Sequence, residues 1–351
     1  MNLLTDAGCA KDDIKLVRLL LSNIKLKVKV NNCLSVEFES TEGSPQGDSL
    51  SGKLFTLVFA GGLYHLRAVA EVKLSRSNPP FTIEMLPLES AYADDGDFMD
   101  EDEDILKQLL PLAKDILSEW NLHINDDKTK FTKFYLANTN EIDEEGNSLR
   151  GNESWRMCKM LGSLMSSTED IANRCNLANI AFTNYNKVWC KKSNITLEKK
   201  LVVYEALVIS VIMYNSSSWA APQDVFNKLD AFHRKHLRRI LNYKWPHVIT
   251  NKDLYKRCNA KPLSERIAQS RWRMLGHILR SDENTPASNA LQFTVESAQR
   301  LKIRRGRPRI TLLSTIKQDL EKRDLNCNTI DDLYYLRSIA NDRTNWKKLY
   351  F

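Results

Sequence analysis

The chain has 351 residues, 42% of them hydrophobic, and a formal net charge of +7. This length predicts two or three domains with ample core, because single domains usually hold roughly 100–200 residues. The apolar runs at residues 54–63 and 206–214 are far shorter than the roughly 18 apolar residues that a membrane-spanning helix needs. Residues 1–6 do not resemble a signal peptide. We therefore expect an intracellular protein, nuclear or cytoplasmic, that is not secreted and has no membrane partner.

The seven cysteines are scattered singly, and no Cys-x-x-Cys pair occurs. This pattern excludes both a disulfide framework and a zinc site. His233 and His236 lie three residues apart but lack a matching second ligand pair, so we expect no metal at them.

The charge divides unevenly along the chain. Residues 1–150 hold 16 Lys/Arg against 26 Asp/Glu, a net charge of −10, and residues 151–351 hold 35 against 18, a net charge of +17. An acidic first half and a basic second half predict a metal-dependent enzyme that grips a polyanion.

The first predicted elements are a helix over residues 14–21 and a hairpin. Apolar residues alternate with lysines over residues 24–30, which predicts a strand with one lysine face. Asn31 and Asn32 supply the turn, and residues 33–38 form the return strand. The lysine face is either solvated or a nucleic-acid contact.

A loop at residues 42–48 leads into a helix that begins near Ser49 and runs through Val58. Gly47 in this loop permits close approach of the backbone to a ligand. Taken alone, the loop sequence indicates only a turn before a helix.

The chemical focus of the sequence is the stretch Tyr-Ala-Asp-Asp-Gly-Asp at residues 92–97, which has apolar residues on both sides. Two adjacent carboxylates at a glycine-containing turn predict the tip of a β-hairpin. Asp94 and Asp95 cannot both face the same side, because successive side chains of a strand point to opposite faces. Mg²⁺ takes one or two protein carboxylates and leaves its other positions to water and phosphates. The pair therefore indicates either a metal-dependent phosphoryl-transfer site or a solvated acidic turn.

A helix with one apolar face is predicted over residues 105–120, and Pro111 is expected to kink it. The acids at residues 100–104 precede this helix, where its positive end favours negative charge. Residues 121–130 then lead into a predicted strand at residues 131–137.

Residues 155–163 predict a pair of strands, and Ser166 with Glu169 forms a possible capping box at the start of a helix. Helical periodicity then recurs through the second half of the chain.

Two basic clusters stand out in that second half. The predicted helix at residues 233–239 sets its apolar stripe inward and leaves four basic residues outside, with Tyr243 and Trp245 close by; the four are Arg234, Lys235, Arg238 and Arg239. A basic face interleaved with aromatic residues suits phosphate contact with base stacking, or it is a plain solvated face. The densest positive cluster is a predicted exposed linker at residues 300–309, which contains Arg304, Arg305 and Arg307.

Four stretches, in order and at plausible spacing, resemble the reverse transcriptases of non-LTR (LINE-type) retrotransposons. They are GSPQGDSLS at residues 43–51, YADD at 92–95, WNLHINDDKTK at 120–130 and MLGS at 160–163. The resemblance implies an α+β fold, with a partial polymerase palm of a small antiparallel sheet and helices, followed by an all-α thumb and a C-terminal helical region.

The implied domains are a partial palm at residues 1–150, a primer-grip strand pair with a helical thumb at residues 151–260, and a basic helical region at residues 261–351. The implied partners are an RNA template, a DNA primer and deoxynucleoside triphosphates, with Mg²⁺ or Mn²⁺ as the cofactor in a two-metal site and no zinc.

The resemblance also implies roles for single residues. Asp94 and Asp95 would be the catalytic metal ligands, and Lys128 would protonate the leaving pyrophosphate, although Lys130 could equally be placed there. Substrate contacts fall to Gln46, Gly47 and Tyr92, and the primer end to Leu161 and Gly162. The nucleic-acid-binding cations are expected to be those of the two basic clusters.

One part of the family pattern is missing from this sequence. A complete two-metal site needs a further aspartate on a strand upstream of the loop at residues 42–48, and we expect the chain to be a fragment that begins just after it. Two divalent ions close together need several bridging carboxylates. We therefore expect an RNA-directed DNA polymerase domain that is inactive alone, or a non-enzymatic nucleic-acid-binding remnant.

Overall fold

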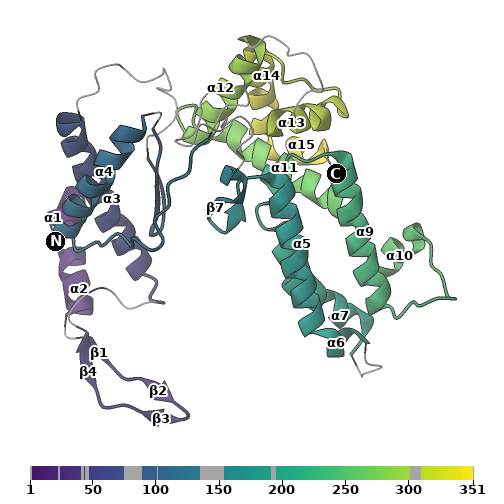
Figure 1. The fold of residues 1–351 in the computed structure, drawn as a ribbon, viewed down its shortest axis with the longest axis horizontal. Helices are drawn as coiled ribbons and strands as arrows, with labels where there is room; N and C mark the ends of the chain where they lie inside the picture. Colours follow the sequence, from purple (N-terminus) through teal and green to yellow (C-terminus); the bar gives the residue numbers. More distant parts are fainter. Residues whose placement is uncertain are drawn as a thin grey trace, which may run out of the picture. The chain divides into compact units, whose positions relative to one another are not determined.

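The computed structural model describes residues 2–22, 24–40, 43, 47–74, 89–100, 102–134, 154–190, 195–300 and 310–350. The chain folds into two compact units, residues 1–130 and residues 131–351 (Figure 1). Short antiparallel strand pairs accompany many helices, which is compatible with the predicted α+β class.

Four helices form most of the first unit: α1 (Asn2–Asp6), α2 (Lys11–Leu21), α3 (Ser51–Lys73) and α4 (Glu103–Glu119). Its small core lies where α3 packs against α4 and contains the buried side chains of Leu66, Leu112, Ala113 and Ile116. The helix predicted from Ser49 therefore exists but extends fifteen residues past Val58, since α3 ends at Lys73.

The length of α3 depends on two glycines in its middle. A Cβ at Gly61 would lie 2.8 Å from Cζ3 of Trp120, and one at Gly62 would lie 2.9 Å from Cδ2 of Leu117. The glycines let the helix backbone approach the end of α4 closely, and this packing offsets their low helix propensity. Helix α4 continues through Pro111 without interruption.

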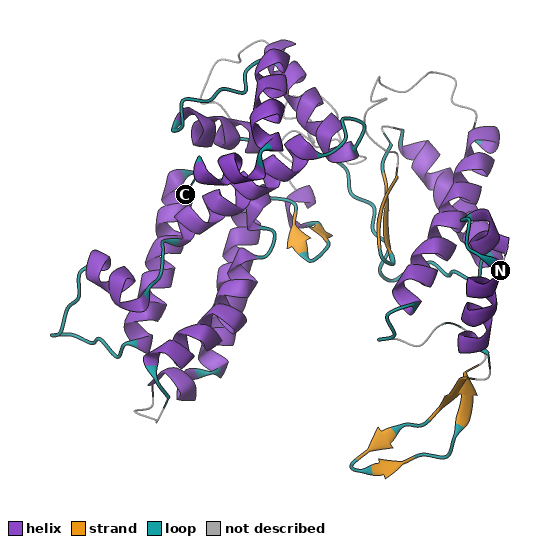
Figure 2. Ribbon diagram, turned by 180° about the vertical axis from the view of Figure 1, so that it is seen from behind, coloured by secondary structure: helices purple, strands orange, loops and turns teal. Residues whose placement is uncertain are grey.

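The strands of the first unit form two hairpins (Figure 2, orange). The first hairpin projects from the end of α2 and contains β1 (Ile24–Leu26), β2 (Lys29–Val30), β3 (Cys33–Leu34) and β4 (Phe38–Ser40), with β1 paired to β4 and β2 to β3. Asn31 and Asn32 have positive φ at its tip, +47° and +65°, as a two-residue hairpin turn requires. The predicted hairpin is confirmed.

The predicted single strand over residues 24–30 is divided into two short ladders. Between them, the Val28 amide donates a hydrogen bond to the Ser35 hydroxyl (2.9 Å). The second hairpin pairs β5 (Glu89–Tyr92) with β6 (Asp95–Phe98).

The second unit is mainly helical. Its elements are a 3₁₀ turn η1 (Ser154–Met157), β7 (Lys159–Met160), β8 (Ser163–Leu164), α5 (Ser167–Asn184), α6 (Asn186–Cys190), α7 (Leu197–Tyr204), a π-helical segment η2 (Glu205–Ile209), α8 (Ser210–Met213), a 3₁₀ turn η3 (Ser216–Ser218), α9 (Gln223–Ile240), α10 (Asn251–Cys258), α11 (Leu263–Arg280), α12 (Pro286–Arg300), α13 (Leu312–Glu321), α14 (Ile330–Asn341) and α15 (Arg343–Lys348).

Two hydrophobic cores support the second unit, and α11 contributes to both. Its first half supplies Leu263 and Ile267 to a core with α5, α7, α8, α9 and α10. Its second half supplies Trp272 to a core with α12, α13, α14 and α15. Trp272 stacks on Trp346 at 4.3 Å between ring centroids, and each indole N–H donates to the other residue's carbonyl oxygen.

Two local predictions in this unit need correction. The strand predicted at residues 131–137 is wrong for its described part, because residues 131–134 have no regular structure. Helix α5 begins where the capping box was predicted, but the Ser166 hydroxyl contacts the Glu169 carboxylate and caps no backbone N–H. In the described part of the chain, no helix has both the length and the apolar character to cross a membrane.

Candidate active site

The acidic stretch forms the tip of the β5–β6 hairpin, as predicted. Tyr92 pairs with Asp95 in the antiparallel register, so Ala93 and Asp94 are the two turn residues. Ala93 has a φ of +54°, which is the positive value that tight hairpin turns demand. Both carboxylates are exposed, and the turn presents them at the tip of the hairpin.

The two carboxylates leave the backbone at different places. Asp94 belongs to the turn, whereas Asp95 begins β6 and shares its face with Asp97, two residues on. Burial raises the pKa of Asp97 above its usual value, and the nearby Asp95 carboxylate raises it further. The sequence alone did not reveal this effect of burial and of Asp95 on the Asp97 pKa.

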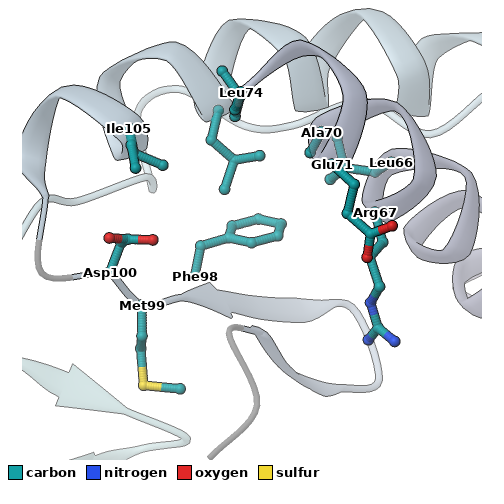
Figure 3. Close-up of a pocket in the computed structure, with 10 residues that line it drawn as sticks. Leu66, Arg67, Ala70, Glu71, Leu74, Phe98, Met99, Asp100 and Ile105 are labelled. Atoms are coloured by element: carbon teal, nitrogen blue, oxygen red, sulfur yellow. The ribbon is translucent and has the colours of Figure 1, made fainter. Parts of the chain in front are cut away.

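The base of the hairpin is fixed to the α3–α4 core. Phe98 at the end of β6 packs against that core, and Figure 3 shows its ring below Leu74, with Ile105 of α4 to one side. A pocket of about 270 Å³ lies beside the ring, and its mostly apolar lining comes from α3, α4 and the end of the hairpin. A Cβ at Gly96 would lie 3.5 Å from Cζ of Phe59 on α3. The acidic turn therefore stands on a hydrophobic base.

The donor set fits one hard cation. Two exposed carboxylates at one turn supply the oxygen ligands that Mg²⁺ prefers, with its remaining positions left to water and phosphate. Among the residues that the structure describes, no cluster of three or more His, Cys, Asp or Glu side chains is arranged to hold a metal ion. Asp94 and Asp95 alone do not form such a cluster.

Of the other predicted residues of the first unit, Gly47 and Lys128 lie in exposed turns, and Tyr92 is the last residue of β5. Lys128 follows α4, its backbone N–H donates to the Asn125 carbonyl oxygen (3.2 Å), and its ammonium pairs with no described residue. Gly47 has a φ of +96°, and a Cβ added there would have no neighbour within 4 Å, so its backbone is open to a ligand. Tyr92 is 69% exposed. Gln46 lies outside the described residues.

The predicted primer-grip residues form a second turn, in the second unit. Leu161 and Gly162 connect β7 to β8, both with positive φ (+46° and +81°). The Tyr214 hydroxyl donates to the Leu161 carbonyl oxygen (2.6 Å), and Nη2 of Arg174 donates to that of Gly162 (2.6 Å). Both carbonyls of the turn are thereby held in place by helices.

A buried ion pair lies directly behind this turn. Asp170 is 1% exposed and Arg174 is 7% exposed; Nε of Arg174 lies 3.6 Å from Oδ1 of Asp170. The same carboxylate accepts hydrogen bonds from the Leu164 amide (3.0 Å) and the Trp219 indole (2.9 Å). The Arg174 guanidinium also stacks over the Tyr214 ring, 4.4 Å from its centroid.

Sequence reasoning missed this network. The i, i+4 spacing of Asp170 and Arg174 on a helix was the available signal, since it permits an ion pair. Burial depends on Trp219 and Tyr214, which are distant in sequence, and no local pattern predicts it.

The basic helix α9 differs in part from its prediction. Of the four basic residues predicted to face outward, only Lys235 is exposed, and the three arginines are half-buried. Arg238 donates to the Asn251 side chain (2.7 Å), and Arg239 donates to Asn186 (3.1 Å) and lies over the Phe182 ring. The arginines thus join α9 to its neighbours. Arg304, Arg305 and Arg307 lie outside the described residues.

His233 and His236 belong to the first core of the second unit. Both Nδ1 atoms face the Tyr204 hydroxyl, at 3.0 Å and 3.4 Å. Burial lowers the pKa of His233 to about 3 and that of His236 to about 4, with nearby arginine charges adding to both shifts. Each ring is therefore neutral at physiological pH and serves as a core side chain.

Comparison with protein families gives one match. Residues 2–165 match the model of the family "Reverse transcriptase (RNA-dependent DNA polymerase)". A comparison with curated proteins gives no match. The matched region contains the acidic turn and ends just after β8, so it includes both turns described above. The match supports a reverse transcriptase-type polymerase domain in this region.

Proposed function

We propose that the chain is part of the reverse transcriptase of a non-LTR, LINE-type retrotransposon and belongs to an enzyme of template-directed nucleotidyl transfer. The observation that carries this proposal is the exposed Asp94-Asp95 pair at a hairpin tip inside the matched region. Residues 1–150 would then be a partial palm, residues 151–260 the primer-grip strand pair and thumb, and residues 261–351 the basic C-terminal region.

The proposed chemistry assigns one task to each residue of the acidic turn. Bound Mg²⁺ would neutralise charge on the transferring phosphoryl group and activate the primer hydroxyl. Asp94 would hold the metal, and Asp95 would assist it from the first position of β6. The exposed ring of Tyr92 would contact the nucleotide or primer, and Lys128 would give a proton to the leaving pyrophosphate.

The second turn has a positioning task in this proposal. The backbone of Leu161 and Gly162 would lie against the primer end. Tyr214 and Arg174 hold this backbone in one conformation. Reacting groups must be held within a fraction of an ångström of the productive geometry, and a turn fixed by buried side chains supplies that rigidity.

Metal placement limits the activity that we propose. Catalysis in this class depends mainly on two ions and the charge they stabilise. Two carboxylates provide too few bridging ligands to hold two divalent ions close together. We therefore propose that a further aspartate completes the site and that the chain as given does not extend a primer.

A second candidate is nucleic-acid binding without catalysis. Residues 131–351 hold 37 Lys/Arg against 22 Asp/Glu, a net charge of +15. Such a surplus favours a polyanionic partner whether or not the acidic turn holds metal.

Metal binding tests the first candidate directly. Titration of the full chain with Mn²⁺, followed by the electron paramagnetic resonance signal of the free ion, should detect one weak site. Asp94→Asn should remove it, and Asp115→Asn, which changes an exposed carboxylate of α4, should leave it intact. Equal Mn²⁺ binding by all three proteins would remove the acidic turn from the proposal.

Primer extension on an RNA template gives the complementary test. The full chain with Mg²⁺ should show no extension, and nucleotide incorporation would show that no further aspartate is needed.

A further inference from the structure

The strongest concentration of positive charge in the described structure spans α9, α10 and the loop that joins them. Residues 231–262, here called the α9–α10 segment, contain nine lysines and arginines and one acid, Asp253, for a formal net charge of +8. That acid forms part of a helix cap, because its carboxylate lies 2.7 Å from the Thr250 hydroxyl. The segment therefore offers an almost unopposed positive surface.

The loop of this segment carries a large, exposed aromatic side chain. Trp245 is 90% exposed, and Val248 beside it is 85% exposed. The other six tryptophans, all within the described residues, are buried or half-buried. Leaving an indole in water forgoes roughly 2 kcal/mol or more of burial energy, so the exposed position of Trp245 suggests a contact with something outside the fold.

The loop that carries Trp245 is attached to the helices on both sides of it. At its start the Tyr243 amide donates to the Arg238 carbonyl oxygen (2.9 Å), and at its end Thr250 caps α10 by accepting from the Asp253 amide (3.1 Å). Arg257 of α10 also donates to the Tyr243 hydroxyl (2.9 Å). The backbone of the loop is therefore attached to helices at both ends.

Three lysines of the loop and of α10 are available to a ligand. Lys244, Lys252 and Lys256 are exposed, and none forms an ion pair with a described residue. A shallow groove of about 590 Å³ lies along the loop and α10, with Val248, Lys256 and Arg257 among its lining residues. By contrast, Arg238 and Arg239 of α9 are occupied by asparagine side chains.

We propose that the loop between α9 and α10 is a binding site for single-stranded nucleic acid, in which a base stacks on Trp245 while Lys244, Lys252 and Lys256 contact the phosphates. This inference deepens the proposed nucleic-acid binding and is independent of the metal chemistry of the acidic turn. The main nucleic-acid contacts would then come from the loop and α10, in place of the α9 arginines.

A single strand fits these observations better than the alternatives. Stacking on an exposed ring requires an unstacked base face, which a duplex does not present. Exposed lysines without an ion-pair partner suit contacts with phosphates. A membrane surface would be favoured by several exposed apolar side chains on one helix face, whereas here they are Trp245 and Val248 on a loop.

Oligonucleotide binding to the full chain tests the proposal. Fluorescence anisotropy would measure affinity for a labelled 12-residue oligo-uridine, the matching oligo-thymidine and a duplex of the same length, with tryptophan quenching as a second readout. We expect both single strands to bind and to quench Trp245, with the RNA and DNA arms showing whether the 2′-hydroxyl contributes. The duplex should bind more weakly and quench less.

Variants separate stacking from charge. Trp245→Ala should lower single-strand affinity about tenfold or more, with an unchanged salt slope, because base–aromatic stacking is worth a factor of that size. Replacing Lys244, Lys252 and Lys256 by Gln should reduce the salt slope by about 0.7 for each lost phosphate contact. Tyr335→Ala and Lys228→Gln, which change an exposed ring and an exposed lysine elsewhere in the unit, should have little effect.

Specific outcomes would overturn the proposal. Wild-type affinity in Trp245→Ala, duplex binding equal to single-strand binding, or binding to vesicles of anionic lipid in place of oligonucleotides would each do so. Because Trp245 and the lysines are exposed, the melting temperature should stay within about two degrees in all variants. Loss of Mn²⁺ binding in Asp94→Asn leaves this site untouched, so failure here and failure of the polymerase proposal are distinguishable.

Discussion

The two units differ in charge, core and exposed surface. Residues 1–130 carry a net charge of −8, from 14 Lys/Arg against 22 Asp/Glu, and residues 131–351 carry +15. Four buried side chains form the described core of the first unit, whereas the second unit has two larger cores joined by α11. The candidate catalytic turn thus stands on the weaker scaffold and the candidate nucleic-acid surface on the stronger one.

Apolar surface shows the same contrast. Helix α2 has no buried residue, and Leu19 on it is 72% exposed. In the first hairpin, Val36 is 87% exposed and Leu34 is 63% exposed. Clusters of this kind mark faces that a partner or another part of a protein covers. We therefore expect the first unit to need additional contacts, whereas the second unit is supported by its own cores.

The largest expected effect is on catalysis in the first unit. In a chain completed by a further aspartate, Asp94→Asn should reduce primer extension on RNA by about 100-fold or more, because it removes a metal ligand from the transferring phosphoryl group. Template affinity should change less than about twofold, since the basic unit is unaltered. Asp95→Asn should do less harm.

Extension rates and template affinities of the three proteins would be measured together. Near-normal extension by the Asp94→Asn protein would contradict the assignment of the acidic turn.

The next effect concerns the stability of the units when separated. Residues 1–150 expressed alone should be poorly soluble or oligomeric, because exposed strand edges and apolar side chains favour association. Residues 131–351 should form a monomer that unfolds cooperatively. Light scattering after gel filtration, with thermal unfolding, would compare them, and a monodisperse, cooperatively unfolding first unit would reverse the comparison.

A single substitution should test the buried ion pair behind the β7–β8 turn. Asp170→Ala leaves the Arg174 charge buried without its carboxylate, which typically costs about 3 kcal/mol or more. Denaturant unfolding of the full chain, followed by fluorescence, would measure the loss, with the exposed Asp224→Ala on α9 as the control. If the two substitutions cost the same, the network does not support the turn.

Acid should weaken the second unit through its two buried histidines. Their pKa values, about 3 and about 4, lie below the ordinary 6.5, so between these values the unfolded chain binds more protons than the folded chain. The two neutral histidines make their full contribution to the free energy of unfolding above about pH 7. This contribution decreases as the pH falls, by about 2 kcal/mol for each histidine at about pH 5.

Unfolding free energies at about pH 7 and about pH 5 would show this loss. His236→Gln should flatten the pH dependence even if it lowers stability at neutral pH, and an unchanged slope would exclude His236 as a cause.

Local chemistry explains which parts of the structure were predictable. Asn31 and Asn32 favour positive φ, so the first hairpin could be predicted from the sequence, and so could the turn at Asp94. The full length of α3 could not, because Gly61 and Gly62 are tolerated only through contacts with Trp120 and Leu117.

Long-range packing explains what was missed at the candidate sites. The Asp170 network needs Trp219, which is 49 residues away in sequence. The α9 arginines were predicted to point outward from helical periodicity alone, and residues on α6 and α10 engage two of them. The adjacency of Asp95 and Asp97 follows from strand alternation, but its effect on the Asp97 pKa depends on burial.

The most direct test of this division of roles is the affinity of the full chain for single-stranded RNA, measured from about 50 to about 200 mM salt with and without a metal chelator. We expect a steep loss of affinity with salt, about −0.7 in the logarithmic slope for each phosphate contact. The affinity should be the same when a chelator is present and when Asp94 is replaced by Asn. Binding that ignores salt, or that disappears when metal is removed, would contradict the claim that the basic unit holds nucleic acid independently of the acidic turn.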